Sequence, residues 1–141
     1  MTKAEKIGEA SKKDPKYLAF IRTLPCYICY SQFFQWGIDK PEGEVLESIA
    51  SNPMFWKTLQ RSHTEAAHVG FSDSKRGRSQ KHPDSECLPL CGLEHHREGK
   101  FSIHRMGADS FFPHYGLYAD DRDLAIKFMQ RLYEETRDDQ R

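Results

Sequence analysis

The stretch TEAAHV (residues 64–69), followed after a polar loop by ECLPLC (residues 86–91), decides the fold of this chain. Residues 64–69 are partly β-branched and favour a strand, and residues 86–90 are typical of a second strand. Between them, residues 70–83 contain glycines and a Ser-Asp-Ser run, which favour a loop. From residue 91 to about residue 98 a helix is expected. The stretch therefore predicts strand, loop, strand and helix in succession.

Side chains that can bind a metal or transfer a proton recur along this unit, at His68, Asp84, His96 and His104. In a strand His68 shares one face with Ala66 and points toward whatever the later helix presents. An imidazole titrates near neutral pH and therefore suits proton transfer. Each of these residues alone is more often structural, but their order favours a common site. The remaining histidines considered are predicted to be structural or exposed: His63, His82 and His114.

A metal site is predicted from the cysteines. Cys26 and Cys29 have the two-residue gap at which a tight turn directs both sulfurs toward one ion. Two cysteines cannot fill a tetrahedral site, so other ligands must come from far along the chain. Cys91 and His95 lie about one helical turn apart and can complete a structural zinc site. The alternatives are ordinary buried cysteines, and a set in which Cys87 replaces His95 instead of being a small buried hydrophobe.

Length and composition favour one domain of 141 residues, with 21 basic and 21 acidic side chains. Four cysteines are too few for a disulfide scaffold, which suits a reducing compartment. No apolar run reaches about 18 residues and no signal segment opens the chain, so we expect no membrane span and a cytoplasmic location.

The balanced charge gives no evidence for a polyanionic partner, so nucleic-acid binding would require a local patch. The polar loop contains such a patch, and its position beside the candidate site favours phosphate binding over a merely solvated loop. The cations concerned are Lys75, Arg76, Arg78 and Lys81.

The flanking segments are predicted to be helical. Residues 1–13 are expected to be a disordered lead-in and residues 14–141 a single domain. Asp14-Pro15 is a helix start, and Pro25 ends that helix just before Cys26. The region from about 30 to 62 is expected to be a helical insertion: an aromatic-rich link, a helix near residues 42–51, and another that starts at Asn52-Pro53 with Phe55, Trp56 and Leu59 inward.

The aromatic residues of this insertion allow two interpretations. Trp36 or Trp56 can stack on nucleotide bases, but aromatic side chains at helical spacing are more often core. Beyond His104 the sequence predicts a short helix over 107–114 and an amphipathic helix over about 121–136. The inward face of that last helix is expected to hold Leu124, Ala125, Phe128, Leu132 and Tyr133.

Taken together, the ordered motifs resemble one known family. They run Pro25-Cys26-x-x-Cys29, EAAHV (residues 65–69), Lys81-x-Pro83-Asp84, PLC (residues 89–91), His95-His96 and GKFSIH (residues 99–104). This order resembles the HNH (ββα-metal, His-Me finger) endonucleases, especially the small phage- and prophage-associated group with a CxxC zinc knuckle before the hairpin. The resemblance covers about residues 15–118. It implies an α+β, mainly helical single domain around a ββα-metal hairpin–helix unit, with DNA as the substrate.

The resemblance also implies roles for individual residues. His68 matches the general base that activates water, and His96 matches the helix ligand of a divalent cation, with His104 as an extra downstream ligand. Asp84 would bind this ion or orient His68. Magnesium or manganese is the expected catalytic ion, with nickel or zinc possible because imidazoles also bind them.

Two departures from the family pattern leave alternatives open. Ala67 stands immediately before the base, where many members have a metal ligand. This favours, as an alternative, a zinc-stabilised nucleic-acid-binding module that does not cleave. The three-residue gap from Cys91 to His95, in place of the more usual two, leaves open which of His95 and His96 serves zinc. A third hypothesis is a protein-interaction adaptor that uses residues 30–62. The sequence does not indicate the oligomeric state.

Overall fold

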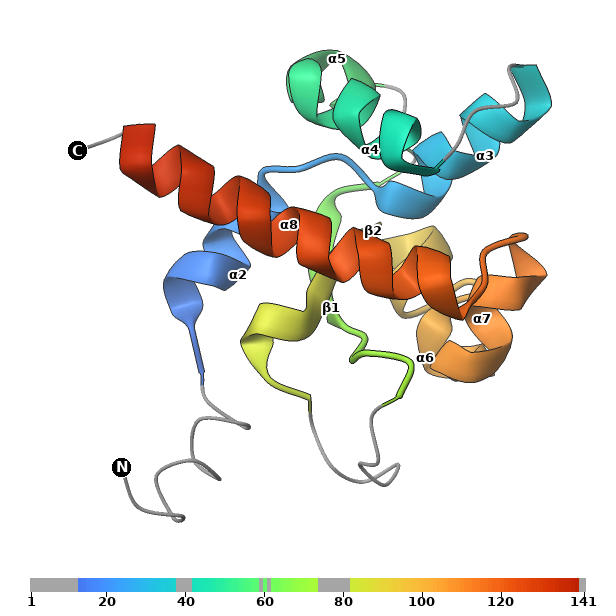
Figure 1. Ribbon diagram of the computed structural model, residues 1–141. Coiled ribbons are helices and arrows are strands. Elements are labelled where there is room, and N and C mark those ends of the chain that lie inside the picture. The colour runs from blue at the N-terminus through green and yellow to red at the C-terminus, as the bar shows by residue number, and fades with distance from the viewer. Residues whose placement is uncertain (1–12, 38–41, 59, 61, 74–81, 140–141) are drawn as a thin grey trace, which may run out of the picture.

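The computed structural model describes residues 13–37, 42–58, 60, 62–73 and 82–139. Its centre is a two-stranded antiparallel sheet surrounded by helices. Figure 1 shows the longest helix, α8 (Ala119–Asp139), crossing the hairpin, with α2 (Pro15–Arg22) toward one end and α6 (Ile103–Met106) and α7 (Ala108–His114) toward the other. The observed class is therefore a small α+β protein, as predicted.

The hairpin consists of β1 (Thr64–His68) and β2 (Cys87–Cys91), with His68 opposite Cys87 and Thr64 opposite Cys91. Every residue of β2 is buried, because helices cover the sheet: α2 packs on both strands, and α3 and α8 pack on β2. The predicted strands are confirmed in type, each to within one residue at its ends. One buried cluster joins the hairpin to the helices, with side chains that run from Tyr17 to Met129 along the chain.

Helix α2 begins and ends as its sequence predicts. The Asp14 side chain accepts a hydrogen bond from the Tyr17 backbone N–H at 3.2 Å, and Pro15 occupies the first turn, where no N–H is needed. The side chains of Tyr17 and Ile21 are buried against the hairpin and α8. The helix thus fixes the chain just before the first cysteine pair.

The segment after Cys26 differs from the prediction. We expected a tight turn followed by an aromatic-rich link, but residues Tyr27–Gly37 form the helix α3. The side chains of Tyr27, Ile28 and Tyr30 are all buried, so the first turn of α3 is apolar on nearly every side. A helix that is buried all round has no polar face, and its periodicity therefore gives little signal.

The two following helices match the prediction in place. They are α4 (Glu42–Ser51) and α5 (Pro53–Lys57), and the Asn52 side chain caps α5 by accepting from the Phe55 N–H at 3.4 Å. Trp56 is a core residue whose indole N–H donates to the Ser48 carbonyl at 3.1 Å. Phe55, expected inward, is 51% exposed instead. The side chains of Trp36 and Leu59 lie outside the part of the chain that the structure describes.

The predicted site helix over 91–98 is wrong in form. The chain makes a single π-helical turn, η2 (Gly92–His96), closed by the hydrogen bond from the Arg97 N–H to the Gly92 carbonyl at 3.0 Å. It then turns sharply at Gly99, where a Cβ atom would collide with the Glu94 carbonyl. Only a residue without a side chain allows this close approach, and the turn ends the helix.

The C-terminal elements agree with the prediction more closely. Helix α7 matches the expected residues 107–114, and α8 extends beyond the expected 121–136 at both ends. On α8 the residues Ala125 and Phe128 are buried as expected, but Leu124 is 42% exposed, and Ile126 and Met129 are buried in its place. Among the described residues no helix is both long and apolar enough to cross a membrane.

Candidate functional site

Three cysteines and a histidine converge from three elements. Cys26 precedes α3 and Cys29 lies in its first turn, Cys91 ends β2, and His95 lies in η2. The ligand atoms of these four residues all lie within 4.8 Å of one another, so the group can hold a metal ion. The predicted set is therefore brought together from positions more than 60 residues apart.

The spacing of these atoms fits a tetrahedral ion. Zn–S bonds of about 2.3 Å and Zn–N bonds of about 2.0 Å place neighbouring ligand atoms roughly 3.5 to 3.8 Å apart. The Cys29 and Cys91 sulfurs are 3.8 Å apart, and His95 Nδ1 lies 3.4 Å from the Cys26 sulfur and 3.7 Å from the Cys29 sulfur. The Cys91 sulfur is closer to His95 Nδ1, at 3.0 Å.

The environment of the thiols also suits a cation. Burial raises the pKa of the Cys26 thiol well above its usual range, and hydrogen bonds to the neighbouring cysteines raise it further. Hydrogen bonds from Cys26 and Cys29 lower the pKa of Cys91. Because thiolates this close together repel one another, a metal ion bound between them would balance their charge.

The structure decides between the alternatives for the fourth ligand. His95 Nδ1 points at the sulfurs, whereas His96 Nδ1 contacts Glu65. Cys87 is buried at the opposite end of β2 from Cys91, about 13 Å away along a regular strand. The metal set therefore includes His95 and excludes Cys87, and Cys87 is part of the hydrophobic core.

His68 forms a close pair with Asp84. His68 Nε2 lies 2.7 Å from Asp84 Oδ1, and Asp84 is almost fully buried in the turn η1 (Asp84–Glu86). The other carboxylate oxygen accepts from the Asp14 N–H at the start of α2. An ionised Asp84 carboxylate would accept from the Nε2–H group of His68, which would leave the lone pair of the ring on Nδ1. The His68 side chain is 24% exposed, which leaves it accessible to a substrate.

A second polar group surrounds His96, and its carboxylate was not predicted from the sequence. His96 Nδ1 donates to Glu65 Oε1 at 2.7 Å, and the Arg97 guanidinium holds both Glu65 oxygens at 2.7 and 2.8 Å. The His104 ring lies 4.5 Å from the His96 ring. A Cβ atom on Gly92 would lie 2.6 Å from the Glu65 carboxyl carbon, so the glycine leaves room for this carboxylate.

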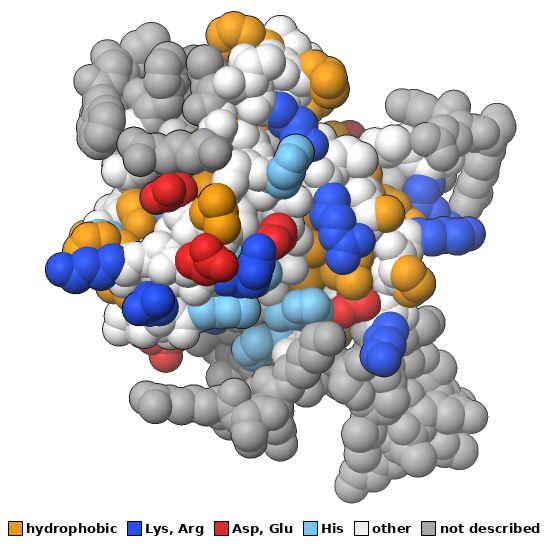
Figure 2. All heavy atoms as spheres, turned by 180° about the vertical axis from the view of Figure 1, so that it is seen from behind, with side chains coloured by type: hydrophobic (Ala, Val, Ile, Leu, Met, Phe, Trp, Pro, Cys, Tyr) orange, Lys and Arg blue, Asp and Glu red, His pale blue; other side chains and the backbone are white. Residues whose placement is uncertain are grey.

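Charge and burial favour the neutral form of His96, which can donate a nitrogen lone pair to a metal ion. The hydrogen bond from Arg97 holds the pKa of Glu65 below its usual range, and burial lowers the pKa of His96. Because Nδ1 carries the proton that Glu65 accepts, the lone pair of His96 lies on Nε2. Figure 2 shows histidine side chains gathered on one face, with acidic and basic side chains beside them.

The predicted catalytic residues are thus divided into two groups. Asp84 pairs with His68, and it does not join His96 and His104, since the described residues contain no second group of three ligand atoms within 4.8 Å. Glu65 and His68 lie three positions apart on β1, so they stand on opposite faces of the strand. One signal in the sequence pointed to Glu65, because it shares a strand face with Ala67, the position where the family ligand is missing.

The predicted phosphate-binding cations lie outside the described residues: Lys75, Arg76, Arg78 and Lys81. The two ends of their loop are described and lie together. Gly70 has φ +78°, and its missing side chain leaves space that the His82 ring occupies. Gly70 and His82, described residues on either side of this segment, therefore lie next to each other.

Comparison of the chain with protein-family models, with curated proteins and with solved structures found no match.

Proposed function

We propose that this chain is a metal-dependent endonuclease of the HNH type, which hydrolyses phosphodiester bonds in DNA in the cytoplasm. The observation that carries the proposal is the contact between His68 on β1 and the buried carboxylate of Asp84 in η1, 2.7 Å apart, with the His68 side chain 24% exposed. A base held by a buried carboxylate is the arrangement that general-base catalysis needs.

In this mechanism His68 Nδ1 takes a proton from the attacking water while the water oxygen forms a bond to phosphorus. The bond from phosphorus to the 3′ oxygen then breaks. Asp84 keeps the ring in the required tautomer and stabilises the imidazolium that forms. The backbone N–H of Asp14 fixes Asp84 in turn, so the base is positioned from α2 as well as from the hairpin.

His96 and His104 are the residues that would hold the catalytic ion. Their rings are 4.5 Å apart, and Glu65 orients His96 by accepting from its Nδ1. When bound, a divalent ion would stabilise charge on the phosphate and on the leaving 3′ oxygen. Magnesium or manganese is proposed, with nickel or zinc also accepted by two imidazoles.

The ion of the Cys26, Cys29, Cys91 and His95 cluster is proposed to be a structural zinc. All four ligands come from the protein and are soft or borderline donors, which suits zinc and leaves no open position for chemistry. The site would connect the start of α3 to the end of β2. DNA phosphates are proposed to bind the loop cations Lys75, Arg76, Arg78 and Lys81, with affinity that falls as salt rises.

A second candidate function is a zinc-stabilised nucleic-acid-binding module that does not cleave. Ala67 favours it, because this residue is fully buried and cannot coordinate an ion. The two proposals differ in one measurable respect, namely hydrolysis.

The experiment that tests the proposal is nicking of supercoiled plasmid by purified protein, treated with EDTA and then supplied with Mg²⁺ or Mn²⁺. We expect added metal to restore nicking in the parent, and His68→Ala to lower the rate by about 100-fold or more at unchanged zinc content. His63→Ala is the matched control, because this neighbouring histidine is exposed and should leave the rate unchanged.

Two outcomes would contradict the proposal. If the parent binds DNA but nicks it with none of the ions, the binding module replaces the enzyme. If His68→Ala and His63→Ala cleave equally well, His68 is not the base.

A further inference from the structure

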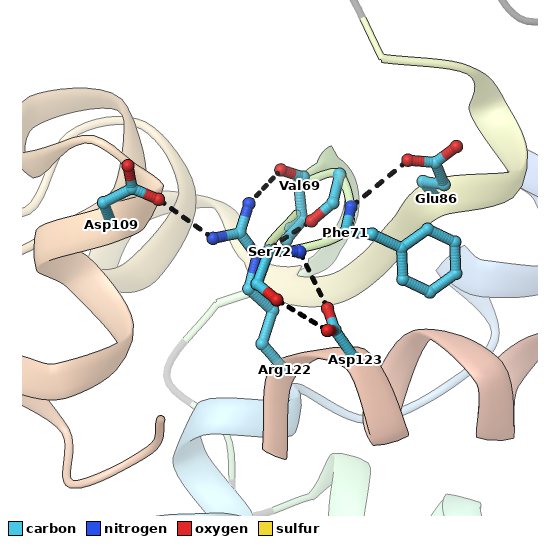
Figure 3. Close-up of polar contacts among 8 residues, drawn as sticks. Val69, Phe71, Ser72, Glu86, Asp109, Arg122 and Asp123 are labelled. Atoms are coloured by element: carbon cyan, nitrogen blue, oxygen red, sulfur yellow. Dashed lines mark hydrogen bonds and ion pairs between the residues drawn. The ribbon is translucent and has the colours of Figure 1, made fainter. Parts of the chain in front are cut away.

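A buried arginine on α8 contacts the backbone immediately after His68. Arg122 is 6% exposed, and its guanidinium donates from Nε to the Gly70 carbonyl at 2.8 Å and from Nη2 to the Val69 carbonyl at 3.0 Å. A third donor, Nη1, reaches Asp109 at 3.1 Å (Figure 3). One side chain therefore joins α7, α8 and the end of β1.

The burial of the charged Arg122 guanidinium requires an explanation. Burying a guanidinium is costly unless it is paired, and Asp109, its carboxylate partner among the described residues, is 96% exposed in its side chain. The two contacts that are themselves buried go to successive peptide carbonyls. Val69 and Gly70 follow the last residue of β1, so their carbonyls lie outside the strand pairing, and Arg122 supplies hydrogen-bond donors to both.

Further hydrogen bonds fix the segment from Val69 to Ser72. The N–H groups of Val69 and Gly70 both donate to the Glu86 carbonyl at 3.2 Å, and the Glu86 carboxylate accepts from the Phe71 N–H at 3.2 Å. The next residue, Ser72, donates from its N–H and its hydroxyl to Asp123 at 2.8 and 2.6 Å. Figure 3 shows this short segment between Glu86 of η1 and Asp123 of α8.

We propose that Arg122 is a positioning residue for His68, acting through the Val69 and Gly70 carbonyls. This inference rests on the proposed function. Asp84 fixes the His68 ring by contacting its Nε2 atom. Arg122 fixes the peptide groups that follow the Cα atom of His68. A shift of about 1 Å in a catalytic group can lower a rate about 100-fold, so an anchor one residue away controls the reaction without touching substrate.

The test replaces Arg122 in the zinc-loaded protein of 141 residues. Arg122→Met removes every donor, and Arg122→Lys retains the charge but not the planar fork. We expect kcat in the nicking assay to fall about 10- to 100-fold in Arg122→Met with KM changed less than about 2-fold, and Arg122→Lys to recover part of the loss. Arg131→Met is the matched control, because Arg131 lies on α8 with its side chain 60% exposed.

A double-mutant cycle shows whether the effect passes through His68. In a His68→Ala background, Arg122→Met should cause no further loss of rate, because the group it positions is already gone. An equal loss in both backgrounds would overturn the inference and assign Arg122 a purely structural role. If Arg122→Met does not retain zinc, Arg122→Lys is used in the same cycle.

A spectroscopic readout separates this inference from the proposed function. In ¹⁵N spectra of the histidine rings, the parent should show His68 as a single Nε2–H tautomer, and the Arg122 variants should show a mixture. Unchanged His68 nitrogen signals in the variants would overturn the positioning role. This readout needs no activity, so it judges Arg122 even if the parent does not cleave DNA.

Discussion

The Glu65 carboxylate contacts two side chains at the end of η2. It accepts hydrogen bonds from His96 Nδ1 and from the guanidinium of Arg97, the next residue. It is 31% exposed, and Gly92 provides the space that it occupies. A carboxylate in this position fixes which ring nitrogen of His96 carries the proton and strengthens the other nitrogen as a metal donor. Glu65 is therefore the residue through which ion binding at His96 should be adjusted.

We expect Glu65→Ala to weaken binding of the catalytic ion about 10- to 100-fold, because His96 loses its orienting partner. Glu65→Gln retains an acceptor oxygen and should have a smaller effect. The measurement is the Mn²⁺ concentration at half-maximal nicking, supported by calorimetric Mn²⁺ titration of the zinc-loaded protein.

Glu98→Ala is the control for the loss of a nearby negative charge, since Glu98 is exposed two residues beyond His96. Equal Mn²⁺ affinities for the parent and Glu65→Ala would show that Glu65 has no part in the ion site.

At the scale of elements, the strands were predictable and the site helix was not. The partly β-branched run TEAAHV and the run CLPLC of β2 favour strands locally, and Asp14 and Asn52 specify helix starts by capping. The π turn of η2 depends on Gly99 approaching the Glu94 carbonyl, which is a tertiary contact without a periodic signal. Spacing in the sequence predicted the candidate metal ligands Cys26, Cys29, Cys91 and His95, whereas the contacts of Glu65 and Arg122 depend on the fold.

Helix α2 contains a buried hydroxyl that makes a testable contribution to stability. Tyr17 packs against the hairpin and meets the Tyr133 ring of α8 edge-on at 5.0 Å. Its hydroxyl has no hydrogen-bond partner among the residues that the structure describes. Burial raises the pKa of this phenol well above its usual range, so the folded protein keeps it neutral.

We expect Tyr17→Phe to raise the free energy of unfolding by about 1 kcal/mol at neutral pH, because the unpaired hydroxyl is removed. The gain should grow above pH 10. There the unfolded parent ionises its tyrosine while the folded parent cannot, so the parent loses stability as pH rises. Denaturant unfolding at pH 7 and pH 10.5 measures both effects.

Tyr118→Phe is the control, because Tyr118 is 63% exposed and should change neither value. A loss of stability in Tyr17→Phe at pH 7 would show that the hydroxyl is satisfied.

At the scale of the whole molecule, a buried apolar cluster and the candidate metal site connect elements from both halves of the described chain. The cluster of apolar side chains runs from α2 to α8, and the metal ligands join the start of α3 to β2 and η2. A structural zinc ion contributes apparent folding free energy on the order of 10 kcal/mol. Removing it should therefore affect the entire fold and not only its neighbourhood.

We expect Cys26→Ala to lose bound zinc and to melt at a temperature that chelators no longer change, because it lacks one of four ligands. The parent should melt far lower after chelation. Cys87→Ala is the matched control: it removes a buried thiol outside the metal set, so it should lose some stability by cavity formation but keep its zinc.

Zinc analysis and thermal unfolding with and without chelator provide the measurements. Loss of zinc in Cys87→Ala but not in Cys26→Ala would show that the ligand set is wrong.

The separation of the metal ligands has a consequence for how the chain is made. Cys26 and Cys29 leave the ribosome long before Cys91 and His95, which follow 62 to 69 residues later. A nascent chain that ends before His95 offers an ion too few ligands for a closed site, so metal loading must wait until β2 and η2 have been synthesised. Chains that end before this point, because of a stalled ribosome or a protease, would therefore carry the Cys26–Cys29 pair without a metal ion and exposed to oxidation.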